Sequence, residues 1–297
     1  MKLEAFLRHE QQVSRRLLSK CKRLGTITCN GSPIRTIDMV FHGDVVILTL
    51  PEEEKGALPN PQLNVPVLYE SEHIIVYSKP PEMPCHPSQG HYTDTLANAF
   101  AAQFPGVSFR CINRLDRNTS GTCIAAKTAY GAGFIQQHTE KCYIAAVTGC
   151  ISEPGTVRAP IARMPGSVIL RCVHPDGKAA VTHYKPLFGN GNHTLVQFRL
   201  ETGRTHQIRV HMAHIGHPLA GDDLYGSPSE EIARHALHCA AVRFPEPETG
   251  ETTAVYAPLP EDIAALFPGM NSCCPAIDFQ KEIWYNEKCQ NIQKGGA

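Results

Sequence analysis

The sequence predicts an α+β fold in which a small helix-hairpin-strand unit precedes a large domain built on a mixed, largely antiparallel sheet. From Val65 onward, strand-like and helix-like segments follow one another without the regular βαβ repeat of a doubly wound sheet. No GxGxxG or GxxxxGK[ST] phosphate loop is present, which argues against a nucleotide-binding fold. The first fifty residues differ from the rest because basic charge gathers on one short segment.

The first fifty residues predict three elements in order. VSRRLLSKCKRLG (13–25) predicts a short helix that has Ser14 as its N-cap and stops at Gly25. In TITCNGSPIR (26–35) an Asn-Gly pair separates two short runs, which is a strong hairpin signal. HGDVVILTL (42–50) predicts a further turn and strand.

Basic residues dominate this unit: six lie between Val13 and Arg35, and no acidic residue does. A solvated helix face would carry the same charges. The pattern R-R-L-L (15–18), K-x-x-G (22–25), an Asn-Gly turn and Gly43-Asp44 resembles the alpha-L RNA-binding module first described in a ribosomal protein. The resemblance implies that five side chains face RNA phosphates, where they supply salt-dependent affinity: Arg15, Arg16, Lys22, Arg23 and Arg35.

Composition changes sharply after this unit. PEEEKGALPNPQLN (51–64) has three consecutive acids and three prolines, so it predicts a linker. We therefore expect a module over 1–50, a linker over 51–64, the large domain over 65–270 and a tail over 271–297.

In the large domain, VLYESEHIIVYSKP (67–80) predicts two short strands around a turn, and DTLANAFAAQF (94–104) predicts a helix capped by Asp94. TCIAAK (122–127) and YIAAVTG (143–149) are typical of buried strands. The alternation of apolar and polar residues in TLVQFRLETG predicts a half-buried strand.

A second helix is predicted to start at Thr205 and to end at Gly216, with Pro218 beyond it. The histidines at 206, 211, 214 and 217 raise the alternative of a metal hydrolase. Only His211 and His214 could share a face, and no HExxH pattern or paired carboxylate accompanies them, so we expect no metal.

Bulk properties limit the remaining classes. The formal net charge is zero, so overall charge does not decide for or against a nucleic-acid partner. The chain shows neither a membrane-spanning run nor a signal-peptide core, which predicts a cytoplasmic protein. We also expect a monomer. The 12 cysteines include no CxxC pair, so we expect small buried side chains rather than zinc ligands or disulfides.

The stretch INRLDRNTSG (112–121) places one carboxylate, Asp116, between two arginines. Alone, this pattern is more typical of a surface ion pair or of an aspartate that caps a turn. It gains weight from the ordered set HIIVYSKPPEMPCHPS, INRLDRNTSGTCIAAKT, EKCYIAAVTG, GRTHQIRVHMAHIGHPLAGDDLYG and HALHCAAVRF.

That ordered set resembles the RluA-type RNA pseudouridine synthases over about two-thirds of the chain, including the signature R-L-D-R-x-T-S-G. With the N-terminal unit, it is similar to the subgroup that modifies large-subunit ribosomal RNA. The resemblance implies the fold of that family, a uridine isomerase activity without cofactor or metal, and RNA as the partner, with transfer RNA as the less favoured substrate.

The resemblance also implies roles for particular residues. Asp116 corresponds to the catalytic aspartate, Tyr143 packs beside the base and is a candidate proton acceptor, and Arg209 pairs with the aspartate. Arg114 matches an arginine that helps to extrude the base, and Arg117 and His206 are expected to contact RNA.

Two departures from the family pattern stand out. Asn113 occupies a position where the family usually has histidine, and the stretch between Lys127 and Tyr143 is several residues short, which predicts a trimmed helix near the site. These departures keep open an alternative function, a catalytically inactive RNA-binding or ribosome-assembly protein.

Overall fold

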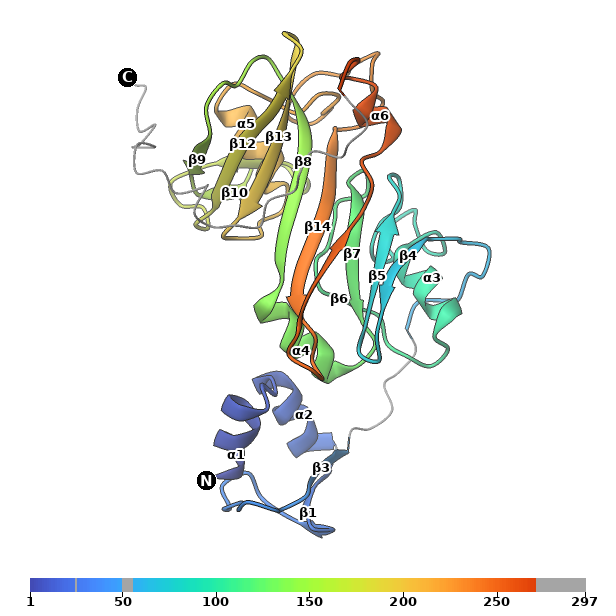
Figure 1. The fold of residues 1–297 in the computed structure, drawn as a ribbon, viewed down its shortest axis with the longest axis vertical. Coiled ribbons are helices and arrows are strands. Elements are labelled where there is room, and N and C mark those ends of the chain that lie inside the picture. Colours follow the sequence, from blue (N-terminus) through green and yellow to red (C-terminus); the bar gives the residue numbers. More distant parts are fainter. Residues whose placement is uncertain (25, 50–55, 271–297) are drawn as a thin grey trace.

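The small N-terminal unit and the large domain have separate hydrophobic cores. The computed structural model describes residues 1–24, 26–49 and 56–270, without the side chains at 16, 20, 23 and 24. One core lies within residues 3–48, and the main core of the large domain begins at Val65. Figure 1 shows the small unit next to the end of the large sheet that carries α4 (Ala129–His138), and Ala129 packs against the small core.

The small unit contains the predicted helix, hairpin and strand. Its elements are α1 (Leu3–Ala5), a π-helical turn η1 (Phe6–Glu10), α2 (Arg15–Leu24), β1 (Thr26–Cys29), β2 (Ser32–Pro33) and β3 (Val46–Thr49). The Leu17 amide donates to Ser14 Oγ at 3.1 Å, which confirms the predicted N-cap. Asn30 and Gly31 have φ angles of 51° and 80°, as a tight hairpin turn requires.

The helical turns before residue 11 were not predicted. Leu3 and Leu7, four residues apart and both buried, were the signal that could have indicated them. The predicted end of α2 at Gly25, part of the predicted linker and the whole predicted tail lie outside the described residues.

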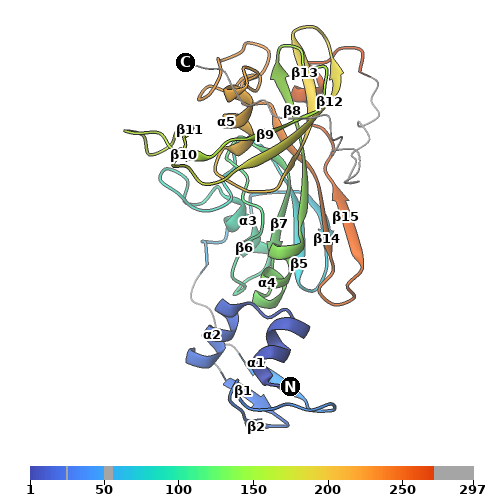
Figure 2. The ribbon, with the colours of Figure 1, turned by 90° about the vertical axis from the view of Figure 1, so that its left-hand side faces the viewer.

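The large domain is built on one mixed, largely antiparallel sheet of ten strands, which confirms the predicted fold class. The strands run in the order β4-β5-β7-β14-β8-β13-β12-β9, with β15 paired to β14 and β6 to β7. The pairing of β7 with β14 is parallel, and the sheet's other pairings are antiparallel. Figures 1 and 2 show the late strand β14 between the two halves of the sheet.

The strand bounds are β4 (Val67–Glu70), β5 (Ile74–Lys79), β6 (Arg110–Cys111), β7 (Ser120–Ala126), β8 (Glu140–Thr148), β9 (Gly155–Arg158), β12 (Val181–Gly189), β13 (His193–Leu200), β14 (Leu237–Pro245) and β15 (Thr252–Tyr256). A separate hairpin consists of β10 (Ile161–Arg163) and β11 (Arg171–Val173). The large domain also has α3 (Leu96–Gln103), α5 (Gln207–His214) and α6 (Glu261–Ala264).

Two predicted helix caps were wrong. α3 is capped by Thr95, which forms a capping box with Asn98, whereas the Asp94 carboxylate lies 2.6 Å from His91 Nδ1. α5 begins after His206, not at Thr205, and the His206 backbone is left-handed with φ 57°. A left-handed non-glycine residue is costly, so it marks a position that the surrounding structure holds in place.

The predicted half-buried strand was also wrong, because β13 is covered on both faces. Val196 and Phe198 pack in the main core, while Leu195 packs in a second cluster with α6. Gln197 is buried, and its amide nitrogen donates to Cys142 Sγ at 3.0 Å. Arg199 pairs with Glu140 at 2.8 Å, so two polar residues with protein partners imitated the polar positions of a solvent-facing strand.

The close approach of β7 to β14 depends on Gly121. Its φ is +109°, and a Cβ placed there would lie 2.2 Å from the carbonyl oxygen of Cys239. Only glycine allows this contact, which places the start of β7 directly beside the inserted strand.

The described part of the chain includes no helix that combines the length and the apolar character needed to cross a lipid bilayer.

Candidate active site

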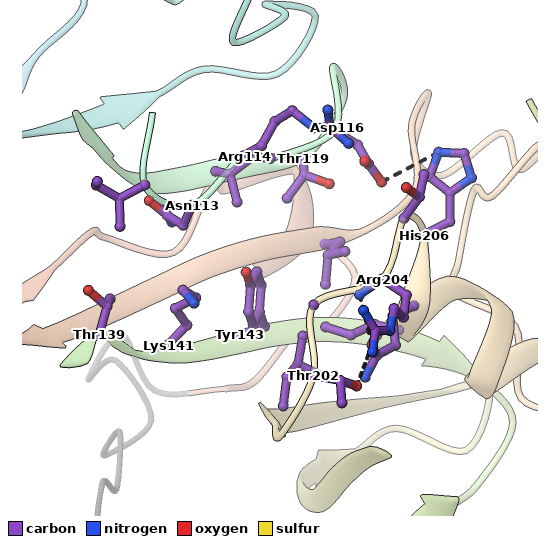
Figure 3. Close-up of a pocket in the computed structure, with 18 of the residues that line it drawn as sticks. Asn113, Arg114, Asp116, Thr119, Thr139, Lys141, Tyr143, Thr202, Arg204 and His206 are labelled. Atoms are coloured by element: carbon purple, nitrogen blue, oxygen red, sulfur yellow. Dashed lines mark hydrogen bonds and ion pairs between the residues drawn. The ribbon is translucent and has the colours of Figure 1, made fainter. Parts of the chain in front are cut away.

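A cavity of about 650 Å³ opens on one face of the sheet, between β8, the loop that joins β6 to β7, and the segment before α5. Thr139, the residue before β8, and Lys141 and Tyr143 within it line the cavity from alternate positions (Figure 3). Successive strand residues point to opposite faces, so these three side chains share one face. Asp116 lines the cavity from the opposing loop.

Buried polar contacts hold the loop that carries Asp116. The Asn113 amide donates to the Thr122 carbonyl at 2.8 Å, and its oxygen accepts from the Ile124 amide at 2.7 Å. The ammonium group of Lys79 donates to the carbonyl of Arg117 at 3.0 Å. Asn113, where the family pattern has histidine, therefore ties the loop to β7.

Two buried histidines secure the end of the same loop. His235 Nε2 lies 2.9 Å from Thr119 Oγ1, and His238 Nδ1 lies 2.9 Å from Ser120 Oγ. Burial lowers the pKa of His235 to about 3 and that of His238 to about 4, so both rings are neutral near pH 7. These neutral contacts join the start of β14 and the residues before it to the end of the loop and the start of β7.

The Asp116 carboxylate faces two partners from α5 and the residue before it. Its Oδ2 lies 3.7 Å from Arg209 Nη1 and 3.8 Å from His206 Nε2, and its side chain is 28% exposed. The arginines beside it in sequence point elsewhere: Arg114 is exposed on the cavity wall, and Arg117 Nη1 lies 3.3 Å from His91 Nε2. The surface ion pair of Asp116 with these neighbours is therefore not the arrangement in the structure.

Arg209 is held by a second acid that the sequence interpretation did not single out. Asp222 is fully buried and accepts hydrogen bonds from Arg209 Nε and Nη2, each at 2.7 Å. Burial raises the pKa of Asp222, but the hydrogen bonds and charge of Arg209 outweigh it and leave that pKa below its usual value. Arg209 Nη1 thereby remains directed at Asp116. The segment GDDLYG, which contains Asp222, was the available sequence signal.

His206 is oriented by another unpredicted residue of that segment, Tyr225. The Tyr225 oxygen accepts the Arg171 amide at 2.9 Å and lies 2.7 Å from His206 Nδ1. Burial raises the pKa of Tyr225 and lowers that of His206, so a neutral phenol meets a neutral imidazole. If the phenol donates to Nδ1, the proton of His206 lies on Nε2, the nitrogen that faces Asp116.

Tyr143 is 8% exposed and contributes a flat apolar wall beside the carboxylate. Burial raises the pKa of its phenol well above the usual value, with further contributions from Cys239 and Asp116. A neutral phenol is a weak base, so this environment supports the predicted packing role more than the predicted proton-acceptor role. Lys141, two residues earlier, adds a partly buried amine that the sequence interpretation overlooked.

The histidines of α5 do not assemble as the metal alternative required. His211 is fully buried, with Nδ1 at 2.9 Å from Thr182 Oγ1 and Nε2 at 2.9 Å from the Ala159 carbonyl. Both ring nitrogens are thus engaged by the protein, and His211 acts as a hydrogen-bonded core residue.

The residues that line this cavity include none of the predicted RNA contacts of the small unit. Arg15, Lys22 and Arg35 are exposed, and the side chains of Arg16 and Arg23 lie outside the described residues. Lys22 pairs with Glu4 at 3.4 Å and Arg35 with Asp38 at 3.0 Å. Exposed pairs of this kind are worth only about 0–1 kcal/mol, so a phosphate can compete for both cations.

Comparison of the chain with known proteins identifies its family. The model of the family described as RNA pseudouridylate synthase matches residues 73–214. An uncharacterized RNA pseudouridine synthase of Bacillus subtilis (strain 168) is 38% identical over 275 residues, which cover 88% of this chain and 97% of that protein. The chain belongs to the RluA-type RNA pseudouridine synthases.

A further relative and a solved structure support the same family assignment. Ribosomal large subunit pseudouridine synthase D of Haemophilus influenzae (strain ATCC 51907 / DSM 11121 / KW20 / Rd) is 36% identical over 263 residues, covering 81% of this chain and 80% of its own length. The solved structure of human RNA pseudouridylate synthase domain containing 1 superposes with a TM-score of 0.55 at 26% identity, covering 66% of this chain and 83% of that one. The predicted fold family and isomerase activity are thereby confirmed, and the synthase acts on uridine in RNA.

Proposed function

We propose that Asp116 is the catalytic nucleophile of this synthase and that Arg209 pairs with its carboxylate. The observation that carries the proposal is the pair of contacts of one buried guanidinium, bidentate to Asp222 and 3.7 Å from Asp116. A uridine in the cavity would exclude water around Asp116, and charges attract more strongly where water is excluded. The fixed positive charge of Arg209, 3.7 Å from the carboxylate, would then help to hold this nucleophile in place.

The isomerisation breaks a carbon–nitrogen glycosidic bond and forms a carbon–carbon bond to the same ribose. A charged Asp116 can serve by attacking the anomeric carbon of the ribose or by adding to the uracil ring. His206 Nε2, 3.8 Å from the carboxylate, can orient it through a neutral hydrogen-bond donor.

The uridine must leave its stack to reach Asp116, which costs a few kcal/mol and least in a loop or mismatch. Tyr143 supplies a planar face for the extruded base, and such stacking is worth roughly 1–3 kcal/mol. Arg114 on the cavity wall and Arg117 beyond it are placed to contact the displaced backbone. We assign them, with His206, to RNA positioning.

We also propose that the substrate is large-subunit ribosomal RNA, because a relative named for that substrate is 36% identical over most of its length. The small unit would add phosphate contacts through Arg15, Lys22 and Arg35, and through Arg16 and Arg23. Such contacts give affinity and register rather than sequence reading. A ribosomal substrate also supports a cytoplasmic location. We propose that the synthase acts as a monomer. We also propose that residues 1–50 form the RNA-binding module, residues 51–64 the linker and residues 65–270 the catalytic domain.

The nucleophile is tested by Asp116→Asn, which keeps shape and removes charge. We expect loss of pseudouridine formation, measured as tritium release from RNA labelled at carbon 5 of uracil, with RNA affinity retained. Asp223→Asn is the matched control, since Asp223 is 68% exposed and lies 3.9 Å from Arg209 Nη2. Full activity of Asp116→Asn, or equal loss in the control, would refute the assignment. No tritium release by the unaltered protein on any RNA would favour the inactive RNA-binding alternative.

The substrate is tested by mapping pseudouridines in ribosomal and transfer RNA from cells with and without the gene. We expect positions in large-subunit RNA to disappear. Loss confined to transfer RNA would overturn the proposed substrate and leave the role of Asp116 intact.

A further inference from the structure

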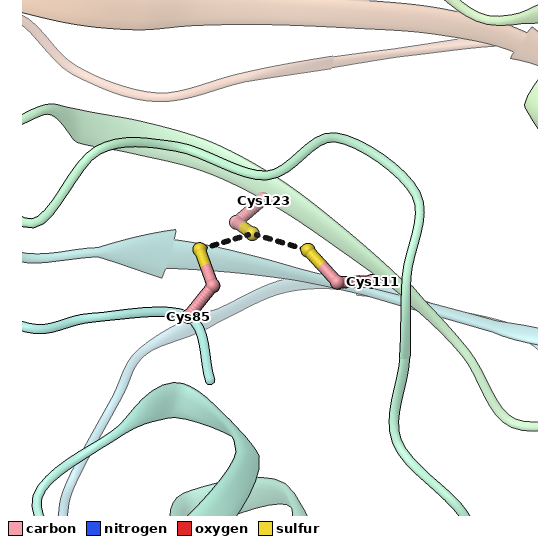
Figure 4. Close-up of side chains that lie close together, drawn as sticks. All are labelled: Cys85, Cys111 and Cys123. Carbon is pink, nitrogen blue, oxygen red and sulfur yellow. Dashed lines mark hydrogen bonds between the residues drawn. The ribbon is translucent and has the colours of Figure 1, made fainter. Parts of the chain in front are cut away.

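Three cysteines from separate segments converge against the loop that carries Asp116. Cys85 lies after β5, Cys111 ends β6 and Cys123 lies within β7. The Cys123 sulfur is 3.9 Å from that of Cys85 and 3.8 Å from that of Cys111, and all three lie within 4.8 Å of one another (Figure 4). Cys123 is fully buried, Cys85 is 2% exposed and Cys111 is half-buried.

These spacings match the requirements of a metal ion that prefers sulfur. With metal–sulfur bonds of about 2.3 Å, as for zinc, two thiolates on a tetrahedral ion lie about 3.8 Å apart. Thiolate ligands select soft or borderline cations over magnesium or calcium. The sulfurs therefore stand close to the positions of three ligands before any ion arrives.

Charge compensation is also in place. Three thiolates around a divalent ion carry one net negative charge, which is costly to bury alone. The ammonium group of Lys79 is buried, donates to the carbonyls of Pro80, Met83 and Arg117, and interacts with Cys85 and Cys123 through its charge.

We propose that Cys85, Cys111 and Cys123 bind one divalent d10 cation of the zinc and cadmium class. Three S–H bonds are replaced by three sulfur–metal bonds, and three protons pass to solvent, so the complex carries one negative charge opposite Lys79. The half-buried Cys111 provides the accessible side of the site.

The site is coupled to the loop that carries Asp116. The Cys85 thiol donates to the Leu115 carbonyl at 3.4 Å, and the Cys123 thiol donates to the Asn113 carbonyl at 3.5 Å. Metal binding removes both protons, so two carbonyls on either side of Arg114 lose a donor. We expect the loaded enzyme to be less active, a consequence that rests on the proposed function of Asp116, whereas the binding itself does not.

Cadmium is the probe, added to the reduced full chain in competition with a chelator and followed by the thiolate-to-cadmium ultraviolet absorption. Serine replaces the exposed Cys150 and the cysteines at 273, 274 and 289, so that they cannot contribute. We expect one tightly held equivalent with three sulfur ligands by X-ray absorption. Cys111→Ser should weaken binding by more than the roughly 10–100-fold typical of a lost outer-shell partner. Cys172 is a half-buried cysteine of β11, and Cys172→Ser should leave cadmium binding unchanged.

Absence of a retained equivalent, fewer than three sulfur ligands, or equal weakening in Cys172→Ser would overturn the site. If Cys111→Ser does not fold, the sulfur count in the protein with Cys111 intact still decides. Cadmium should lower tritium release only when Cys111 is present. Unchanged release by a loaded enzyme would refute the coupling and leave the binding site standing.

Discussion

Arg209 lies between the carboxylates of Asp222 and Asp116, which differ in burial and in their distance from the guanidinium. Replacing each aspartate by asparagine should therefore separate the contribution to fold stability from the contribution to catalysis. Asp222 is 0% exposed and accepts two hydrogen bonds of 2.7 Å from the guanidinium. Asp116 is 28% exposed and lies 3.7 Å away. Asp222→Asn leaves a buried cation without its partner, whereas Asp116→Asn removes only a weak, partly solvated pair.

The expected magnitudes follow from burial. Removing one partner of a buried ion pair costs about 3–5 kcal/mol of unfolding free energy. An exposed or partly exposed pair is worth about 0–1 kcal/mol. In a domain of this size, 1 kcal/mol shifts the melting temperature by roughly 2–4 °C. We expect Asp222→Asn to lower it by about 6–20 °C and Asp116→Asn by less than about 4 °C.

The assay is thermal unfolding followed by circular dichroism, with tritium release measured on the same preparations. The pKa of Asp222 is lowered in the folded state, so its contribution is complete above the unfolded value of about 3.9 and is lost as the pH falls through the lower folded value. The difference between wild type and Asp222→Asn should therefore be constant from about pH 5 to 8. Activity should be lost in Asp116→Asn despite its intact fold.

Equal destabilisation by the two substitutions would refute this reasoning, because it would mean that Arg209 does not distinguish the two acids. Asp223→Asn serves here as well, and it should change neither the melting temperature nor the activity. A stable Asp222→Asn variant with wild-type turnover would show that the orientation of Arg209 does not depend on the buried pair.

Three further predictions concern other parts of the molecule. Gly121→Ala should lower the free energy of unfolding, measured with urea, by more than about 3 kcal/mol, because its Cβ would lie 2.2 Å from the Cys239 carbonyl oxygen. The control is Gly90→Ala, where the space around the added Cβ is open; an equal loss of stability in the two variants would contradict the prediction. His235 has a folded pKa of about 3, so it stays neutral while the unfolded chain gains a proton below about pH 6.5, and stability should fall by up to about 1.4 kcal/mol per pH unit. His235→Gln should flatten that slope between pH 6 and pH 4, and an unchanged slope would refute the assignment. Arg15→Ala should reduce the salt dependence of RNA binding by about 0.7–0.9 in log–log slope, and an unaltered slope would remove this residue from the interface.

The sequence by itself determined the family and part of the local structure. The Asn-Gly turn, the Ser14 cap and the buried strands could be predicted, because turn chemistry and local hydrophobic patterns act over a few residues. The signature around Asp116 indicated the chemistry, because a rare combination of motifs in one order is far more specific than any one of them. Local patterns failed where a tertiary contact supplied the missing partner, as Gln197 shows by its bond to Cys142.

Only the tertiary structure decided how those residues work together. It joined Arg209 to Asp222 and directed the remaining guanidinium nitrogen at Asp116, and it gathered three cysteines that spacing had suggested were unrelated. The physical reason is that these residues come from separate segments that pack together: the loop between β6 and β7, α5 and the segment after it, and the three segments that carry the cysteines. Pairing over such separations depends on burial and charge compensation, which no local window of residues contains.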